Sequence, residues 1–291
     1  MSATRTLGHV KEIWRFPVKS MQGSTVPESL VTPGGLVGDR GWAMRDDTRQ
    51  EVQWGKLYPQ LMLCTARYRE EPAPGTATPV DITFPDGSVF GSDDPEVHRK
   101  LSELCGRPAS LWPLQPASNR EFYKRYKPDP AQWAAEIGAA FAREPGEPQP
   151  DFAQFPEVLI DYVSVPGTFF DNEEIHLLTT ASLATMAAAN PQATWDVRRF
   201  RPNFLIETPP GASGLAEQAW LGRKLCIGEA TLEISAPTPR CGMTTRPQGD
   251  LPFDKTILRT IVREGGQNLG VGARVRIPGK VRAGDVVALI D

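Results

Sequence analysis

The sequence has 291 residues, a formal net charge of −3 and 32 basic residues. A chain of this length can form one large domain or two ordinary ones, and its basic residues are dispersed, which argues against a nucleic-acid-binding surface. With 28 prolines, 26 glycines and only 8% aromatic residues, the composition predicts a β-rich protein with many short elements and turns.

The cysteines indicate a reducing compartment. Cys64, Cys105, Cys226 and Cys241 are widely spaced and form no C-x-x-C pair, which argues against structural zinc, an iron–sulfur cluster or a disulfide scaffold. No apolar run approaches the length of a membrane span, and residues 1–14 lack the apolar core of a secretory signal. We therefore expect a cytoplasmic protein that binds no membrane.

Residues 1–114 are predicted to form a first β-rich unit. Apolar residues alternate with charged ones over 7–16 and stop at Pro17, which predicts a strand. The turn signals PGG, PAPG and PDG separate further predicted strands over 24–32, 41–47, 60–70, 80–90 and 109–114. One helix is predicted over 93–106, with Asp93 or Asp94 as its cap.

The composition changes over 115–166, which we interpret as a linker or covering arm. It contains a basic-aromatic stretch over 120–127, a predicted helix over 131–143 and a proline-rich run. A solvated face is the favoured interpretation of the basic-aromatic stretch. Stacking on a planar ligand is the alternative.

Residues 167–291 are predicted to form a second, barrel-like sheet with a few helices. Strands are predicted over 175–180, 199–208, 224–237 and 285–291. A helix over 181–190 is ended by Asn190-Pro191. A second helix, over 256–266, is closed by glycine.

The acid–base residues are few. His9, His98 and His176 lie in predicted strand, helix and strand contexts, which favours structural roles. No G-x-S-x-G, H-E-x-x-H or P-loop pattern occurs, so common hydrolase, zincin and nucleotide-binding functions lack support.

Cations, hydroxyl groups and an amide stand instead at the predicted strand ends: Lys19, Ser20, Arg40, Arg201 and Asn203. Arginine and lysine beside hydroxyl groups are what a buried phosphate or other oxyanion requires. Surface ion pairing is the default interpretation of any one of them.

Cys241 lies among proline and polar residues, in a predicted turn. Arg240 and Arg246 are close enough in sequence to favour its thiolate form, and one thiolate suits a soft metal. Burial as a small hydrophobic residue is an equal alternative on local sequence alone.

Seven motifs, taken in order, resemble those of the MOSC family, named for the C-terminal domain of molybdenum cofactor sulfurase. They are FPVKSMQG, VGDRGWAM, LLTTASL, RRFRPNFLIE, PRCGMTT, NLGV and VRAGDVV. The likeness is to its two-part bacterial members, which pair an N-terminal β-barrel domain with the MOSC domain, as does the mitochondrial amidoxime-reducing component. It implies a mainly β fold with some α: an N-terminal barrel over 1–114, the arm over 115–166 and the MOSC domain over 167–291.

The resemblance implies a molybdenum cofactor, in which molybdenum is held by a molybdopterin that carries a dithiolene and a phosphate. Cys241 corresponds to the metal ligand and is the one residue expected to be catalytic. Five residues match family positions at the pterin and its phosphate, namely Lys19, Ser20, Arg40, Arg201 and Asn203. Thr180 and Ser182 match a cofactor-facing turn less closely.

The function implied is that of an oxidoreductase acting on N-hydroxylated or N-oxide-type small molecules. The chain has no cysteine pattern for a fused cluster, so its electrons are expected from a separate ferredoxin-, flavodoxin- or cytochrome-type protein with its reductase. Gly272 and Pro239 depart from the residues common in amidoxime reducers, a change expected to loosen the cofactor or widen the pocket.

Two other functions remain open. A sulfur carrier or sulfurtransferase would act through a persulfide on Cys241, and a carrier module would bind the cofactor without turnover. Pyridoxal phosphate binding is an attribute that family members can carry, although no pyridoxal-type desulfurase domain is expected here.

Overall fold

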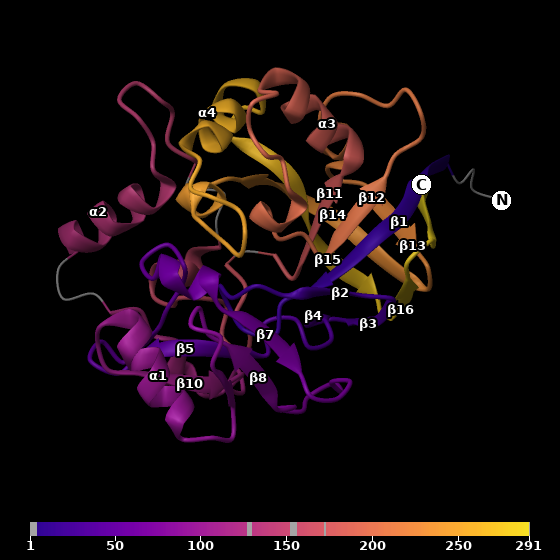
Figure 1. Ribbon diagram of the computed structural model, residues 1–291. Coiled ribbons are helices and arrows are strands. Elements are labelled where there is room, and N and C mark those ends of the chain that lie inside the picture. Colours follow the sequence, from indigo (N-terminus) through magenta and orange to yellow (C-terminus); the bar gives the residue numbers. More distant parts are fainter. Residues whose placement is uncertain (1–4, 127–129, 152–155, 172, 291) are drawn as a thin grey trace.

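The computed structural model describes residues 5–126, 130–151, 156–171 and 173–290 and is mainly β (Figure 1). Its strands are β1 Arg5–Arg15, β2 Ser24–Val26, β3 Glu28–Thr32, β4 Gly35–Leu36, β5 Trp42–Asp46, β6 Glu51–Val52, β7 Thr65–Tyr68, β8 Val80–Thr83, β9 Val89–Gly91, β10 Ala109–Pro113, β11 Ile175–Thr179, β12 Phe204–Glu207, β13 Lys224–Ile227, β14 Ala230–Pro239, β15 Asn268–Ile277, β16 Gly279–Arg282 and β17 Val286–Ile290. Its α-helices are α1 Glu96–Cys105, α2 Pro130–Phe141, α3 Thr180–Ala189 and α4 Lys255–Glu264. Short 3-10 turns are η1 Pro59–Leu63, η2 Arg120–Tyr123, η4 Glu157–Ile160, η5 Val197–Arg199, η6 Ala216–Trp220 and η7 Gly242–Thr245.

Seven strands close into a barrel, in the order β12, β11, β15, β14, β13, β17 and β1. Pairing of β1 with β12 closes it, and only β11 and β12 run parallel within it. Its interior holds fully buried aliphatic and aromatic side chains, among them Ile13, Phe204, Leu225 and Val271. The predicted mainly β fold with a barrel and some helix is confirmed.

Strand β1 lies in this barrel although it is the first strand of the chain. His9 pairs with Val286 of β17, and Ile13 pairs with Phe204 of β12. Lys11 is exposed while Val10 and Ile13 are buried, as alternation predicts, whereas Arg15 at the end of the strand is buried. The first strand thus packs with the second unit, and the domain division at Leu114 stays a prediction.

The rest of the first unit packs around a second core. Strands β10, β5 and β6 form one sheet, and β7, β8 and β9 form another. Helix α1 covers them through Val97 and Leu101, both fully buried. It lies within the predicted 93–106: Oδ1 of Asp94 accepts a hydrogen bond from Glu96 N, and Gly106 ends the helix at φ 68°.

Several predicted strands differ from those observed. The segments 24–32, 80–90 and 224–237 each contain parts of two strands, which are β2 and β3, β8 and β9, and β13 and β14. The strand predicted over 60–70 divides into η1 and β7. The strand predicted over 199–208 begins only at Phe204, because the preceding residues form η5 and then a turn with Arg201 at φ 54°.

The glycine-rich NLGVGARV, interpreted from sequence as a turn, is strand β15. Gly270 is required there by a close approach: a Cβ at this position would lie 2.2 Å from Nε2 of His176. Glycine thus makes room for a histidine on the neighbouring strand rather than ending the strand.

The arm over 115–166 carries η2, α2 and η4. Phe122 and Tyr123 are buried and contact the ring of Phe169, so this part of the basic-aromatic stretch packs rather than forming a solvated face. Lys127 lies outside the described residues. Among the helices that are described, none combines the length and apolar character needed to cross a bilayer.

Candidate functional site

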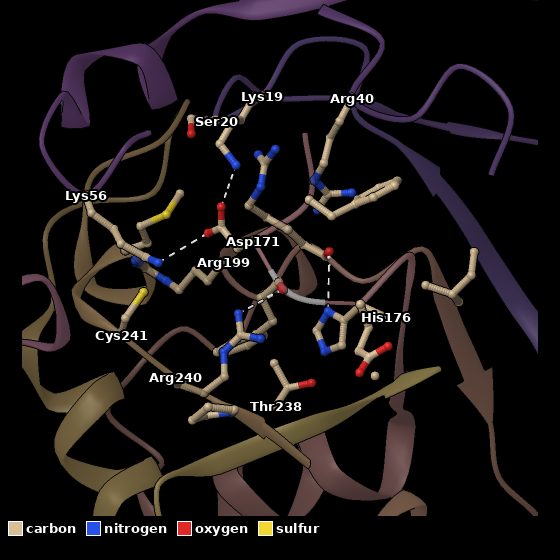
Figure 2. A pocket seen from close by; sticks show the side chains of 18 of the residues that line it. Lys19, Ser20, Arg40, Lys56, Asp171, His176, Arg199, Thr238, Arg240 and Cys241 are labelled. Atoms are coloured by element: carbon tan, nitrogen blue, oxygen red, sulfur yellow. Dashed lines mark hydrogen bonds and ion pairs between the residues drawn. The ribbon is translucent and has the colours of Figure 1, made fainter. Parts of the chain in front are cut away.

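Loops from both units and from the arm meet around one pocket (Figure 2). Its lining combines several basic side chains with one thiol. The principal lining residues are Lys19, Ser20, Arg40, Lys56, Phe141, Asp171, His176, Arg199, Arg201, Thr238, Arg240, Cys241 and Met243.

Five of the eight predicted site residues line this pocket: Lys19, Ser20, Arg40, Arg201 and Cys241. Three of them have left-handed backbone angles, with φ 68° at Ser20, 52° at Arg40 and 54° at Arg201. Such angles are uncommon for non-glycine residues and persist where surrounding contacts hold them. Here Oγ of Ser20 accepts from Gly55 N over 2.7 Å, and Arg40 N donates to Phe16 O over 2.7 Å.

Asn203 supports the pocket from outside rather than lining it. Its side chain is buried. The amide Nδ2 donates to Oδ2 of Asp39 over 2.9 Å, and the side-chain Oδ1 accepts from His176 N over 3.0 Å. Asp39 in turn forms an ion pair with Arg40. Asn203 therefore positions two lining residues.

Thr180 and Ser182, the softer predictions, also lie outside the pocket lining. Ser182 Oγ and Thr179 Oγ1 both donate to the buried carboxylate of Glu217, and Thr180 Oγ1 accepts from Thr208 N over 3.1 Å. These hydrogen bonds connect the start of α3 to Glu217 and Thr208.

Lys19, Asp171 and Lys56 form one charged cluster in the pocket. Asp171 pairs with Lys19, and its Oδ2 lies 3.2 Å from Nζ of Lys56. Burial lowers the pKa of Lys19, although Asp171 opposes this shift. Burial disfavours the charged form of Asp171, but the two lysines outweigh it and hold the pKa of its carboxyl well below the usual range. The two lysines therefore hold Asp171 in its charged form.

Arg201 and Arg240 retain donors with no hydrogen-bond partner among the described residues, Nη2 of the first and Nε of the second. Burial and the charge of Arg40 lower the pKa of Arg201 to about 9. Burial lowers the pKa of Arg240 to about 10, against the opposing effect of Cys241. A buried guanidinium with an unused N–H is a site for an anionic acceptor.

His176 lines the pocket, where sequence favoured a structural role. Its Nδ1 lies 3.4 Å from Arg201 O, and its Nε2 has no hydrogen-bond partner within the described ranges. Burial and the charge of Arg240 lower the pKa of His176 to about 3, so the imidazole is neutral at pH 7.

Cys241 is a free, partly exposed thiol in the loop between β14 and η7. No cluster of three or more His, Cys, Asp or Glu side chains suited to a metal ion exists in the part of the chain that the structure describes. A metal at Cys241 would therefore take most of its ligands from a bound molecule. The unpartnered donors of Arg201 and Arg240 and the single thiol of Cys241 together fit a metal-bearing, phosphorylated organic group.

Two domain families match the chain side by side. The MOSC N-terminal beta barrel domain matches residues 7–103, and the MOSC domain matches residues 166–288. The chain belongs to the MOSC family.

Among relatives of this MOSC chain, mitochondrial amidoxime reducing component 2 of Bos taurus is 28% identical over 255 residues, which cover 82% of this chain and 66% of that protein. Molybdenum cofactor sulfurase of Oryza sativa subsp. japonica is 25% identical over 264 residues, 81% of this chain and 28% of that protein. The chain thus spans just under two thirds of the first relative and under a third of the second. The YUAD protein structure from Bacillus subtilis aligns over 99% of this chain and 98% of its own, with 10% identity and a TM-score of 0.44.

Both departures from the pattern of amidoxime reducers line the pocket of this MOSC protein. A Cβ at Gly272 would lie 2.5 Å from Cγ of Glu173, so the side chain of Glu173 occupies the space beside it. Pro239 lies at the end of β14 and pairs with Asn268 of β15. The predicted effect of these residues on cofactor binding stays a prediction.

Several lining residues were not predicted from sequence. Lys56, Phe141, Asp171 and Arg199 come from irregular segments or helix ends, where an isolated polar or aromatic residue gives no periodic signal. Arg240 was noted only as a neighbour of Cys241.

Proposed function

We propose that this chain binds a molybdenum cofactor in the pocket and reduces N-hydroxylated or N-oxide-type small molecules. The family and both named relatives support a function related to molybdenum cofactor, and an enzymatic one. The observation that carries the proposal is the meeting of Lys19, Ser20, Arg40, Arg201 and Cys241, from four distant segments, in one pocket.

The residues present fit such a cofactor. Its phosphate requires buried, fixed donors in place of water, and the unused N–H groups of Arg201 and Arg240 supply them. Its metal requires a soft ligand beside the dithiolene, which Cys241 supplies. Lys19, Ser20 and Arg40 would hold the pterin and its phosphate.

The bound cofactor supplies two-electron redox chemistry. In the overall reaction the N–O bond of the substrate breaks and the oxygen leaves as water after two electrons and two protons arrive. The nitrogen of an N-hydroxylated substrate keeps one hydrogen more than before, whereas both protons end in water when the substrate is an N-oxide. The chain's own residues would orient the cofactor and supply the cations that neutralise its charge. His176, neutral at pH 7, adds no further positive charge.

The electron donor is proposed to be a separate ferredoxin-, flavodoxin- or cytochrome-type protein. The proposed location is the cytoplasm, with no nucleic acid or membrane as partner. These points rest on the sequence alone, as does pyridoxal phosphate binding.

The second candidate is sulfur transfer through a persulfide on Cys241. It is favoured by the likeness to a molybdenum cofactor sulfurase and by the partial exposure of the free thiol. It requires a partner that supplies the sulfur. Carriage of the cofactor without turnover is the remaining alternative.

One experiment separates these functions. The chain and its Cys241→Ala variant are produced in a host that makes molybdenum cofactor, and metal and pterin are measured. The proposed reductase should hold molybdenum in a Cys241-dependent way and be reoxidised by N-hydroxylated compounds. Stoichiometric pterin without reoxidation would indicate carriage, whereas a trappable persulfide in protein without metal or pterin would indicate sulfur transfer.

A further inference from the structure

The last turn of α2 and the residues after it pack directly against the loop that carries Cys241. A Cβ at Gly242 would lie 3.1 Å from Cβ of Ala142 and 3.3 Å from Ala140 O. The arm thus touches the backbone immediately beside the thiol. Phe141, between these two contacts, lines the pocket together with Cys241.

Arg143 ties the arm to the residue that precedes the cysteine. Its Nη2 donates to Arg240 O over 3.0 Å and to Oε1 of Gln267 over 3.1 Å. Its Nη1 and Nε donate to the arm's own carbonyls, at Phe141 over 2.9 Å and Pro148 over 3.1 Å. One guanidinium therefore joins the end of α2 to the Cys241 loop and the start of β15.

Arg259 of α4 holds the same stretch from the other side. Its Nη2 donates to Ala142 O over 2.6 Å, and its Nη1 pairs with Glu147. Residues 141–148 are thus fastened both to the cysteine loop and to α4. This fastening makes them a fixed wall rather than a loose connection.

The opposite side of Phe141 faces a cation. Nζ of Lys56 lies 5.8 Å from the centre of the Phe141 ring and 4.0 Å from that of Trp54, while it also pairs with Asp171. Figure 2 shows Lys56 and Cys241 at the same end of the pocket. The Phe141 ring and a lysine held by Asp171 therefore line the same pocket as the thiol.

We propose that Phe141 determines the size of the molecules that reach the Cys241 end of the pocket, and that Arg143 is the positioning residue that holds Phe141 in place. The part of this proposal that concerns enzyme substrates rests on the proposed function, whereas the part that concerns access of small molecules to the thiol does not. Substrates with a narrow group next to the N–OH function are the class that this wall admits.

The test compares two thiol reagents of different size on full-length protein produced without cofactor. Modification of Cys241 by iodoacetamide and by N-phenylmaleimide is followed by peptide mass spectrometry, which separates Cys241 from the other three cysteines. In Phe141→Ala the phenylmaleimide-to-iodoacetamide rate ratio should rise about tenfold, the factor that a lost barrier of ~1.4 kcal/mol produces. Phe253→Ala, at a ring that is 55% exposed and outside the pocket lining, should leave the ratio unchanged.

Arg143→Gln should raise the ratio in the same direction, and Arg143→Lys should restore part of the selectivity because an ammonium can still reach one of the carbonyls. Arg276→Gln, which breaks an exposed pair with Glu233, is the matched control. Thermal unfolding verifies that each variant is folded. An unchanged ratio in folded Phe141→Ala would overturn the proposal.

In cofactor-loaded protein the same Phe141→Ala variant should accept bulkier N-hydroxylated compounds. If loaded wild-type protein reduces none of them while the reagent ratio still shifts, the proposed function fails and the role of Phe141 stands. If reduction occurs but neither ratio nor substrate range changes, the role of Phe141 fails alone.

Discussion

The side-chain amide of Asn203 donates to Oδ2 of Asp39 over 2.9 Å, and the same carboxylate pairs with Arg40 in the pocket. Its other oxygen accepts from Phe16 N over 2.8 Å. Asn203, expected from sequence to touch the cofactor, thus reaches the pocket through an acid and an arginine.

Asn203→Ala should therefore weaken cofactor retention without removing a lining residue. Loss of a buried donor leaves Asp39 under-satisfied and should lower the free energy of unfolding by roughly 1–3 kcal/mol. Denaturant unfolding and pterin content measure the two effects. Asn119→Ala, at an exposed position, is the control, and normal pterin content in Asn203→Ala would refute the indirect role.

Cys241→Ser should abolish metal-dependent turnover, because a hydroxyl is a poor ligand for a soft metal. We expect a loss beyond about a hundredfold, the upper end of what removal of a supporting residue costs. Pterin should remain partly bound through the basic side chains that line the pocket. Cys226→Ser changes a partly exposed thiol outside the pocket lining and should behave as wild type; full turnover by Cys241→Ser would remove the ligand assignment.

Asp171→Asn should shift the pH dependence of cofactor retention. Burial lowers the pKa of Lys19 and the charge of Asp171 opposes that shift, so loss of this charge lowers the pKa further. Lys19 then loses its proton at a lower pH, and retention should decline earlier as pH rises from neutral. Pterin content after gel filtration at a series of pH values measures this, with Asp86→Asn, which breaks a surface pair with Lys100, as control. If pterin content fell at the same pH in wild type and Asp171→Asn, this prediction would be wrong.

His176→Gln should make the protein less sensitive to acid. The pKa of His176 is lowered to about 3 by burial and Arg240, whereas a histidine in the unfolded chain titrates near its ordinary pKa of 6.5. Between these values only the unfolded state binds the proton, so the free energy of unfolding falls as pH falls through this interval. Denaturant unfolding from pH 7 into the acid range should show a smaller decline in His176→Gln than in wild type or in His9→Gln, where the ring is exposed. An equal decline would exclude His176 as the source.

Local patterns predicted much of the fold because they act within a few residues. Alternation located β1, and the capping aspartates located the start of α1. The same reasoning missed β15, where Gly270 leaves space for the side chain of His176 on the neighbouring strand. Closure of the barrel by β1 depends on partners more than 190 residues away in the sequence, for which there is no local signal.

The candidate site was predicted from sequence motifs, which explains both the residues that the prediction placed correctly and those that it did not. A motif gives the residue type at a position but not the direction of its side chain. Asn203 and Ser182 turn toward Asp39 and Glu217 instead of the pocket. Lys56 and Asp171 belong to no motif, and only the fold brings them together.

The closure of the barrel by β1 also dictates an order of events during synthesis. Strand β1 is made well before β12 and β17, its two neighbours within the barrel, although β2 pairs with it locally. Until β17 has been made, β1 lacks a barrel partner on that edge, and strands that wait in this way are prone to pair wrongly or aggregate. The barrel should therefore close late and slowly, as expected where contacts are distant in sequence, and chaperone supply should affect the yield of this protein more than that of one whose barrel closes strand by strand.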